Sequence, residues 1–204
     1  MSNPPAFRRS EPDARRADLI AATARVLARE GTGGASVRAI AVEAGVSPGL
    51  VGHYFAGIDA LVAATYAHVE QTVSEALDAA VAAAGADPRA RLDAFVTASF
   101  SPPIASGELL ATWTAFWSLV RSRADIARQH DEQYAAFRAR LETLLAECGL
   151  PAARLRHSAI AITALVDGLW LELCLSPQAF SADEADAIAR SVLDALISTG
   201  RSAD

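Results

Sequence analysis

The sequence predicts an all-α protein, and three observations support that prediction. Sustained alternation of apolar and polar residues, which is the pattern of β-strands, is absent along the 204 residues. Alanine, leucine, arginine and glutamate, all strong helix formers, dominate the composition. Glycine and proline cluster between stretches of helical periodicity, where they end one helix and begin the next. Counting these stretches predicts about nine helices.

The first third of the chain is divided into short helices. A helix is expected from about Asp13 to Gly31, and a glycine-rich loop follows it. Ser36 can cap a second helix over residues 37–44, because its side chain can accept a hydrogen bond from the first turn. Gly45 is placed to end that helix in the left-handed conformation.

A third helix begins directly after this turn. Ser47 can cap it, and Pro48 takes its first position, where the missing N–H costs nothing. Two short helices joined by a tight glycine turn are the framework of a DNA-reading helix-turn-helix, although a plain helical hairpin shows the same features. Small and apolar residues supply the seam between the helices: Ile40, Ala41, Ala44, Val46, Val51 and Tyr54.

The remaining two thirds of the chain predict a larger helical body. A long helix runs from Asp59 to about residue 84. Shorter loops then separate helices near 89–100, 108–122, 125–147, 152–175 and 182–198. We therefore expect three regions: a flexible N-terminal arm over 1–12, a helix-turn-helix domain over 13–58, and a larger helical domain over 59–204.

The charges are unevenly distributed along the chain. The net charge is −6, and all 18 basic residues are arginine. Residues 1–67 hold seven arginines against six acidic residues, whereas the rest holds eleven arginines against eighteen acidic residues. A near-neutral head can approach phosphate groups while an acidic body is repelled by them, so the asymmetry is compatible with DNA binding by the head.

The sequence offers no arrangement typical of catalysis or of a metal site. The four histidines are scattered, and no Ser/His/Asp, Cys/His or HExxH pattern is present. The two cysteines, Cys148 and Cys174, lie in no CxxC motif. We therefore expect no enzyme activity, no metal and no cofactor. The longest apolar run, 159–175, is interrupted by polar residues, and the N-terminus has no secretory signal, so a cytoplasmic protein is expected.

Residues 23–61, TARVLAREGTGGASVRAIAVEAGVSPGLVGHYFAGIDAL, resemble the DNA-binding head of the TetR family of one-component regulators. That head ends in a motif close to V-S-x-G-x-x-x-x-Y-F-x-x-K-x-x-L, and the match covers residues 15–67. Its serine–histidine–tyrosine–phenylalanine ending resembles the BetI-type branch, the choline-responsive repressors of glycine-betaine synthesis. TWTAFWSLV at 112–120 and ALVDGLWLELCLS at 164–176 are also similar to helices of that branch.

The resemblance implies a symmetric dimer with two heads one DNA turn apart, which read a pseudo-palindromic operator in the major groove. It assigns DNA binding to the domain over 13–58, and ligand binding and dimerisation to the domain over 59–204. The positions that it assigns to DNA binding are Arg38, Ser47, Pro48, Gly49, Leu50, His53 and Tyr54. Two positions depart from the family pattern. Gly52 stands where a phosphate-contacting tyrosine is common, and Ile58 stands where the fourth helix usually begins with lysine. Both departures remove DNA contacts.

The segment 159–175 is apolar almost all round, so a helix here must be covered on two sides. A fully buried helix in a monomer would satisfy this requirement. The resemblance favours a homodimer, because in the family the last two helices, here 152–175 and 182–198, pack against their counterparts as a four-helix bundle.

Aromatic and acidic residues in the body, taken together with the resemblance to the BetI-type branch, predict a pocket for a cation. Trp113, Phe116 and Trp117 share one helix face, and Trp170 lies in the other matching segment. Ring faces attract cations, and carboxylates balance their charge, so a choline-like compound or a polyamine would suit such a site. A stripe of core aromatics is the alternative. The candidate ligand-binding residues are Trp113, Phe116, Trp117, Trp170, Asp167, Glu108 and Tyr134, with Phe100 and His68 as weaker ones.

The sequence thus predicts a ligand-responsive DNA-binding transcriptional regulator, a repressor released from its operator by a small molecule. The other hypothesis is a helical small-molecule-binding protein, or a minor enzyme, whose head no longer binds DNA. The residues at positions 52 and 58 distinguish the two, because they determine how many phosphate contacts the head keeps.

Overall fold

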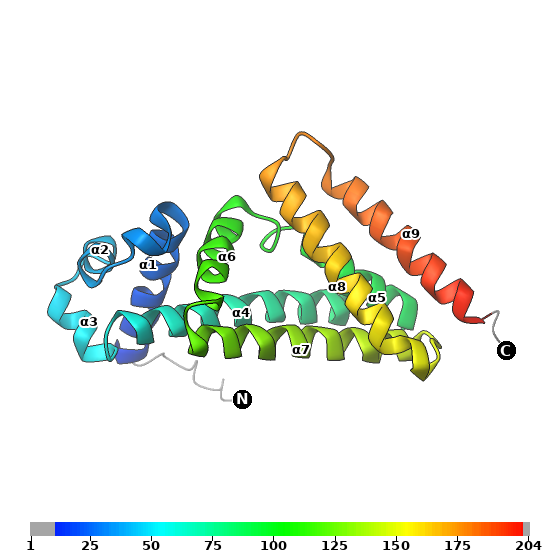
Figure 1. The fold of residues 1–204 in the computed structure, drawn as a ribbon, viewed down its shortest axis with the longest axis horizontal. Helices are drawn as coiled ribbons and strands as arrows, with labels where there is room; N and C mark the ends of the chain where they lie inside the picture. The colour runs from blue at the N-terminus through cyan, green and yellow to red at the C-terminus, as the bar shows by residue number, and fades with distance from the viewer. Residues whose placement is uncertain (1–10, 202–204) are drawn as a thin grey trace, which may run out of the picture.

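The structure is a computed structural model that describes residues 11–201, with side chains described over 12–198. Within that range the chain forms nine α-helices and one short 3-10 helix, so the predicted all-α fold is confirmed. Figure 1 shows a small group of three helices at one end of an elongated body. The helices are α1 (Glu11–Gly34), α2 (Val37–Glu43), α3 (Pro48–Tyr54), α4 (Ile58–Ala83), α5 (Pro88–Thr97), α6 (Gly107–Val120), α7 (Ala124–Glu147), α8 (Ala152–Leu175) and α9 (Ala182–Arg201), with the 3-10 helix at Ala98–Phe100.

The helix boundaries lie close to those expected, with informative differences in α1. This helix starts at Glu11, two residues before the predicted start, so the last two residues of the expected arm are helical. The predicted end at Gly31 corresponds to a kink, because Gly31 has φ 63° and ψ −168° inside α1. Residues 1–10 of the expected arm lie outside the described residues.

Local capping chemistry defines the three-helix head. The backbone N–H of Ala39 donates to Oγ of Ser36 at 3.1 Å, which caps α2 as predicted. Gly45 takes φ 66° after that helix. Its N–H donates to the carbonyl of Val42 at 3.1 Å, and the N–H of Val46 donates to the carbonyl of Ala41 at 2.9 Å. This paired pattern is a Schellman motif, which turns the chain sharply from α2 towards α3.

The head has a hydrophobic core of its own. Residues from α1, α2, α3 and the start of α4 are buried together: Leu19, Ile20, Ala22, Val26, Ile40, Ala41, Val51, Phe55 and Leu61. Arg25 and Arg29 of α1 both pair with Glu43 of α2, at 2.7 and 3.0 Å, which adds polar contacts at the rim. The expected packing seam between α2 and α3 therefore lies against α1.

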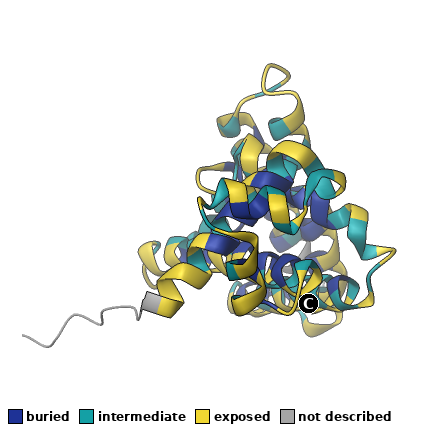
Figure 2. Cartoon of the chain, turned by 90° about the vertical axis from the view of Figure 1, so that its left-hand side faces the viewer, coloured by how far each residue is buried: buried dark blue, intermediate teal, exposed yellow. Residues whose placement is uncertain are grey.

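In the body, α4 and α7 run side by side in the same direction, α8 packs across α7, and α9 packs against α8 and α5 (Figure 1). Buried segments concentrate between these helices and exposed segments lie on the outside (Figure 2). The body core contains large side chains that are almost fully buried, among them Tyr66, Phe100, Phe116, Ile126, Leu141 and Leu145.

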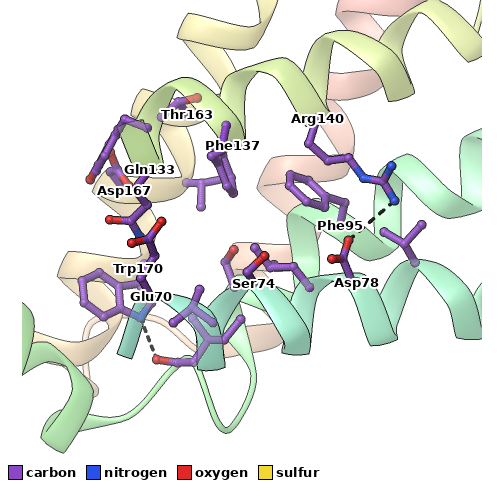
Figure 3. Close-up of a pocket in the computed structure, with 18 of the residues that line it drawn as sticks. Glu70, Ser74, Asp78, Phe95, Gln133, Phe137, Arg140, Thr163, Asp167 and Trp170 are labelled. Carbon is purple, nitrogen blue, oxygen red and sulfur yellow. Dashed lines mark hydrogen bonds and ion pairs between the residues drawn. The ribbon is translucent and has the colours of Figure 1, made fainter. Parts of the chain in front are cut away.

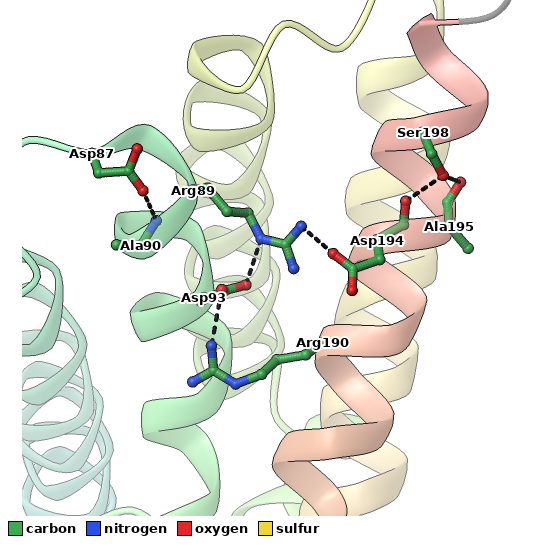
Figure 4. Close-up of polar contacts among 8 residues, drawn as sticks. All are labelled: Asp87, Arg89, Ala90, Asp93, Arg190, Asp194, Ala195 and Ser198. Carbon is green, nitrogen blue, oxygen red and sulfur yellow. Dashed lines mark hydrogen bonds and ion pairs between the residues drawn. The ribbon is translucent and has the colours of Figure 1, made fainter.

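Ion pairs hold α9 against α5. The carboxylate of Asp93 accepts from Nε of Arg89 at 2.8 Å and from Nη1 of Arg190 at 2.9 Å, and Arg89 also pairs with Asp194 (Figure 4). The side chain of Asp93 is only 14% exposed, whereas those of Arg190 and Asp194 are 45% and 68% exposed, so the network is shielded from solvent only on the α5 side.

The start of α4 connects the head to the body. Ile58 packs against both hydrophobic clusters, and Leu61 belongs to the head cluster whereas Val62 belongs to the body cluster. Arg123, at the start of α7, pairs with the carboxylate of Asp59 at 2.7 Å. Helix α1 also packs against α6. A change in the position of α4 within the body would therefore be passed directly to the head.

Candidate effector cavity and DNA-reading surface

The body encloses a cavity of about 730 Å³ between α4, α5, α6, α7 and α8. Its size falls within the range of small-molecule binding sites, which is about 300–1,000 Å³. Figure 3 shows Glu70, Asp167 and Trp170 at one end, and Arg140 with Asp78 and Phe95 at the other. The two ends differ in chemistry and are described in turn.

Three tryptophans form a wall at the first end. The rings of Trp113 and Trp117 on α6 are stacked, with centroids 6.4 Å apart and planes at 27°. Trp170 on α8 meets Trp117 edge-on at 6.2 Å and 84°. Its indole N–H donates to the carbonyl of Ile104 at 3.0 Å, and this buried bond fixes the orientation of the ring. The wall therefore presents fixed ring surfaces to the cavity.

Two carboxyl groups face the same end, Glu70 from α4 and Asp167 from α8 (Figure 3). Burial raises the pKa of Asp167, although a hydrogen bond from Tyr134 and the charge of Arg138 work against this effect. Burial and the nearby charge of Glu132 likewise raise the pKa of Glu70. Neither carboxyl forms a salt bridge with any residue in the described part of the chain. This end therefore holds two acidic groups that have no ion-pair partner among the described residues.

Tyr134 of α7 lies beside Asp167. Burial and the charge of Asp167 raise the pKa of the Tyr134 hydroxyl, so this group keeps its proton and acts as a donor to the carboxylate. The ring of His130 packs against that of Tyr134 with centroids 4.4 Å apart. His130 lies one turn earlier on α7, so this contact holds the tyrosine ring in place at the edge of the cavity.

The opposite end is lined by arginine and phenylalanine. Arg140 of α7 pairs with Asp78 of α4 at 3.6 Å, and Arg91 of α5 pairs with Glu147 at 2.6 Å. The rings of Phe95 and Phe137 pack with centroids 5.0 Å apart. The cavity therefore has an acidic, aromatic end and a basic end, with an apolar surface between them.

The structure brings five of the seven candidate ligand residues to this cavity: Trp113, Trp117, Tyr134, Asp167 and Trp170. Phe116 lies outside the lining. It is fully buried against Tyr66, with ring centroids 4.8 Å apart. Glu108 is exposed in the first turn of α6 and also lies outside the lining. The weaker candidates do not line it either, because His68 is exposed on α4 and Phe100 is buried in the core.

Sequence reasoning missed the contribution of α4. Glu70, Val73, Ser74, Leu77 and Asp78 all line the cavity from this helix. Their spacing of three and four residues is that of one helix face. The available signal was a carboxylate, Glu70, on the same face as the buried apolar residues. Phe95, Gln133, Phe137 and Arg140 were also missed.

The candidate DNA-binding residues lie on the surface of the head. Arg38 on α2 is exposed, as are Pro48, Gly49 and His53 on α3, while Leu50 and Tyr54 are partly buried. The rings of His53 and Tyr54 meet edge-on at 5.1 Å. Ser47 occupies the N-cap position of α3, but its side chain does not make the capping hydrogen bond that the sequence predicts. Its hydroxyl can therefore form a hydrogen bond with another group.

The two departures from the family pattern have different surroundings. A Cβ placed on Gly52 would meet no heavy atom within 4 Å, so this position is open to solvent and could hold a larger side chain. The side chain of Ile58 is half-buried and contributes to the junction between head and body. At the position of the missing lysine, the side chain therefore packs against the protein.

Comparisons with known proteins agree across the whole chain. Residues 19–65 match the model of the bacterial regulatory proteins of the tetR family, and residues 88–198 match that of the BetI-type transcriptional repressor C-terminal domain. The HTH-type transcriptional regulator BetI of Paraburkholderia phytofirmans is 36% identical over 187 residues, covering 91% of this chain and 94% of that protein.

Solved structures give the same picture. A candidate transcriptional regulator from Pseudomonas aeruginosa PAO1 is 42% identical with a TM-score of 0.85, covering 94% of each chain. A candidate regulator from Saccharomonospora viridis, solved in complex with choline, has a TM-score of 0.75 at 19% identity and covers 89% of this chain and 96% of its own. Two family models, the relatives and the described fold coincide, and the chain belongs to the TetR family of transcriptional regulators, in its BetI-type branch.

Proposed function

We propose that this regulator is a repressor that binds a pseudo-palindromic operator as a homodimer and leaves it when a cationic small molecule fills the body cavity. The observation that supports this function most strongly is the cavity itself. Three tryptophans and two carboxyl groups that have no salt bridge within the described part of the chain border it, and α4, which leads directly into the head, forms one of its walls.

A quaternary ammonium group is the ligand chemistry that fits this end of the cavity best. Such a cation carries no hydrogen-bond donor on nitrogen, so ring faces and nearby carboxylates recognise it through charge alone. The indole N–H of Trp170 already donates a hydrogen bond to the carbonyl of Ile104, so Trp170 would contact the ligand through its ring. The choline complex of the Saccharomonospora viridis protein, which has the same fold, supports this proposal.

Ligand binding would reach DNA through α4. Glu70 in the middle of this helix faces the cavity, while Ile58 at its start packs against the head. A ligand that draws α4 towards α8 would change the separation of the two heads in a dimer. Release from DNA then requires only that the ligand prefer one form of the dimer. It must bind more tightly to the form whose head separation does not fit the operator than to the form whose separation does.

The outer faces of α8 and α9 support a dimer. Ile160 and Leu175 on α8 are 42% and 64% exposed, and Ile188 on α9 is 43% exposed. Among the described helices, α8 is also the one that is long and apolar enough to cross a membrane by length and composition alone. In a cytoplasmic regulator, burial of this face against a second copy explains the apolar character, and the 152–175 and 182–198 segments would form the interface.

On the head, we assign the start of α3 and Arg38 to the operator. The N-terminal turn of α3 would point its backbone N–H groups at a phosphate, and Leu50 would meet a thymine methyl group. His53 and Tyr54 would donate to phosphates, since their side chains lie near the end of α3 on the exposed side of the head.

A gel shift with the DNA upstream of the regulator's own gene tests this function. We expect a sequence-specific shift at low salt and a clearly weaker one for the His53→Ala/Tyr54→Ala double variant. Glu75→Gln, an exposed change on α4 outside the cavity and the head, serves as the control. If no sequence-specific shift forms at low salt, the repressor function is wrong. The chain would then be a helical small-molecule-binding protein whose head lost its DNA contacts at Gly52 and Ile58.

A further inference from the structure

The cavity is much larger than a trimethylammonium group requires. Its volume of about 730 Å³ is typical of sites that enclose drug-sized molecules. A choline-sized cation at the tryptophan end would leave the region between Phe95 and Arg140 unfilled. The following inference rests on the proposed function, since it names the class of effector that would fill the whole cavity.

Arg140 at the far end has unused hydrogen-bonding capacity. Its Nε is buried and has no hydrogen-bond partner among the described residues. Its ion pair with Asp78 is long, at 3.6 Å, and the Asp78 side chain is 63% exposed. A buried donor without an acceptor destabilises the folded state, so an acceptor brought by a ligand would stabilise it. Arg91 is different, because Glu147 already pairs with it at 2.6 Å.

The two ends are separated by a defined distance. Helices α4 and α7 run in the same direction. On α7, Gln133 and Tyr134 lie at the acidic end of the cavity, and Arg140 lies about two turns further along the helix. A rise of about 1.5 Å per residue places Gln133 and Arg140 about 10 Å apart along the axis. The corresponding interval on α4, from Glu70 to Asp78, is about 12 Å.

The surface between the ends is mostly apolar, with Ser74 as a polar residue on α4. Val73 and Leu77 of α4, Phe95 of α5 and Phe137 of α7 line the cavity along this interval. Figure 3 shows Glu70 and Asp167 together on one side, Phe137 between, and Arg140 on the other side. An occupant that matches this lining must be cationic at one end, apolar in the middle and anionic at the other end.

We propose that the effector is an extended zwitterion whose ammonium group lies among the tryptophans, Glu70 and Asp167, and whose carboxylate accepts hydrogen bonds from Arg140. The two charged groups are separated by an apolar linker of about 10 Å, roughly the length of three extended amino-acid residues. The guanidinium offers a planar fork of donors, which suits a carboxylate better than a neutral oxygen.

Calorimetric titration of the full chain with two homologous series of compounds tests this proposal. One series is linear trimethylammonio carboxylates of about two to about ten carbons, and the other is alkyltrimethylammonium ions of matched length that lack the carboxylate. We expect affinity in the first series to rise until the charges are about 10 Å apart. At that length the carboxylate should bind about tenfold more tightly than its matched alkyl compound, as a charge-assisted hydrogen bond would give.

Arg140→Met is the decisive variant, with Arg128→Met, an exposed change on the same helix, as its control. Arg140→Met should remove the tenfold preference for the carboxylate and leave binding of the alkyl compounds unchanged. Arg140→Gln provides the same measurement if the methionine variant does not fold.

Two results would overturn the proposal. In the first, affinity falls with chain length; in the second, the preference for the carboxylate survives in Arg140→Met. In both cases, binding of choline to the wild-type protein would leave the proposed cation-responsive function intact. If neither choline nor any compound of the two series binds, the cationic effector itself is refuted.

Discussion

Asp167→Asn tests the electrostatic basis of cation binding. The carboxyl lines the cavity, makes no salt bridge within the described part of the chain, and has a pKa raised by burial. A cation at about 4 Å would interact with it by about 4 kcal/mol at an effective dielectric constant of about 20. The energetic cost of ionising a buried carboxyl offsets part of this attraction. In the variant, Glu70 also remains to attract the cation. We therefore expect a net loss of about 2 kcal/mol, or about 30-fold in the dissociation constant for choline.

The same substitution predicts a pH-dependent change in stability. Because burial raises the pKa of Asp167 in the folded protein, the folded state holds the proton more tightly than the unfolded state does. The stability contributed by this group is thus present below the unfolded pKa, about 4, and is lost as the pH rises through the folded pKa. At pH 7 the ligand-free Asp167→Asn protein should resist urea better than the wild type, and the difference should shrink towards pH 4.

Calorimetry with choline and urea unfolding at pH 7 and pH 4 measure these two effects. Glu172→Gln is the matched control, since it removes one exposed carboxylate from the same helix outside the cavity. If Asp167→Asn binds choline within about twofold of the control, the carboxylate does not balance the charge of a cation, and our account of the site fails.

Three further predictions concern the fold and the head. Asp93→Asn removes the charge between Arg89 and Arg190, so we expect urea unfolding to report a loss of about 2 kcal/mol; an unchanged midpoint would show that these pairs do not hold α9. Gly45→Ala should destabilise the protein by about 1 kcal/mol in the same assay, because Gly45 has φ 66°. Gly49→Ala should leave stability unchanged, because a Cβ at Gly49 would meet no heavy atom within 4 Å. Ile58→Lys should steepen the salt dependence of operator affinity by adding a phosphate contact, and an equal slope by fluorescence anisotropy would contradict that role.

The head was predictable from the sequence because local chemistry determines it. The cap at Ser36, the left-handed Gly45 and the proline at position 48 act within one helical turn, so their effects do not depend on distant contacts. The same reasoning placed the end of a helix at Gly31. Helix α1 continues past that residue to Gly34, but its backbone leaves helical geometry where the glycine predicts it.

The cavity was only partly predictable because its lining depends on tertiary packing. Trp113, Phe116 and Trp117 share a helix face, yet Phe116 turns to Tyr66 in the core while Trp117 turns to Trp170. Periodicity identifies a buried face without showing which of its residues meet a neighbouring helix and which meet a cavity. The basic end was missed for the same reason, since Arg140 is one of several charged residues along α7 and periodicity does not single it out.

The position of the two weakened DNA contacts also depends on context. From the sequence, Gly52 and Ile58 are equivalent losses of a phosphate contact. In the structure, Gly52 faces open space, whereas Ile58 packs at the junction through which α4 connects the cavity to the head. Ile58 can therefore contribute to transmission of the ligand signal in a way that a lysine at the surface would not.

Operator binding followed by fluorescence anisotropy, with choline and its neutral isostere 3,3-dimethylbutanol, tests the central claim most directly. The two compounds have nearly the same shape and differ in the positive charge, which the carboxyl groups and tryptophan rings of the cavity would recognise. We predict that saturating choline weakens operator affinity about tenfold and that the isostere at the same concentration leaves it unchanged. Equal effects of the two compounds, or operator affinity that choline does not alter, would contradict the claim that a cation in this cavity controls DNA binding.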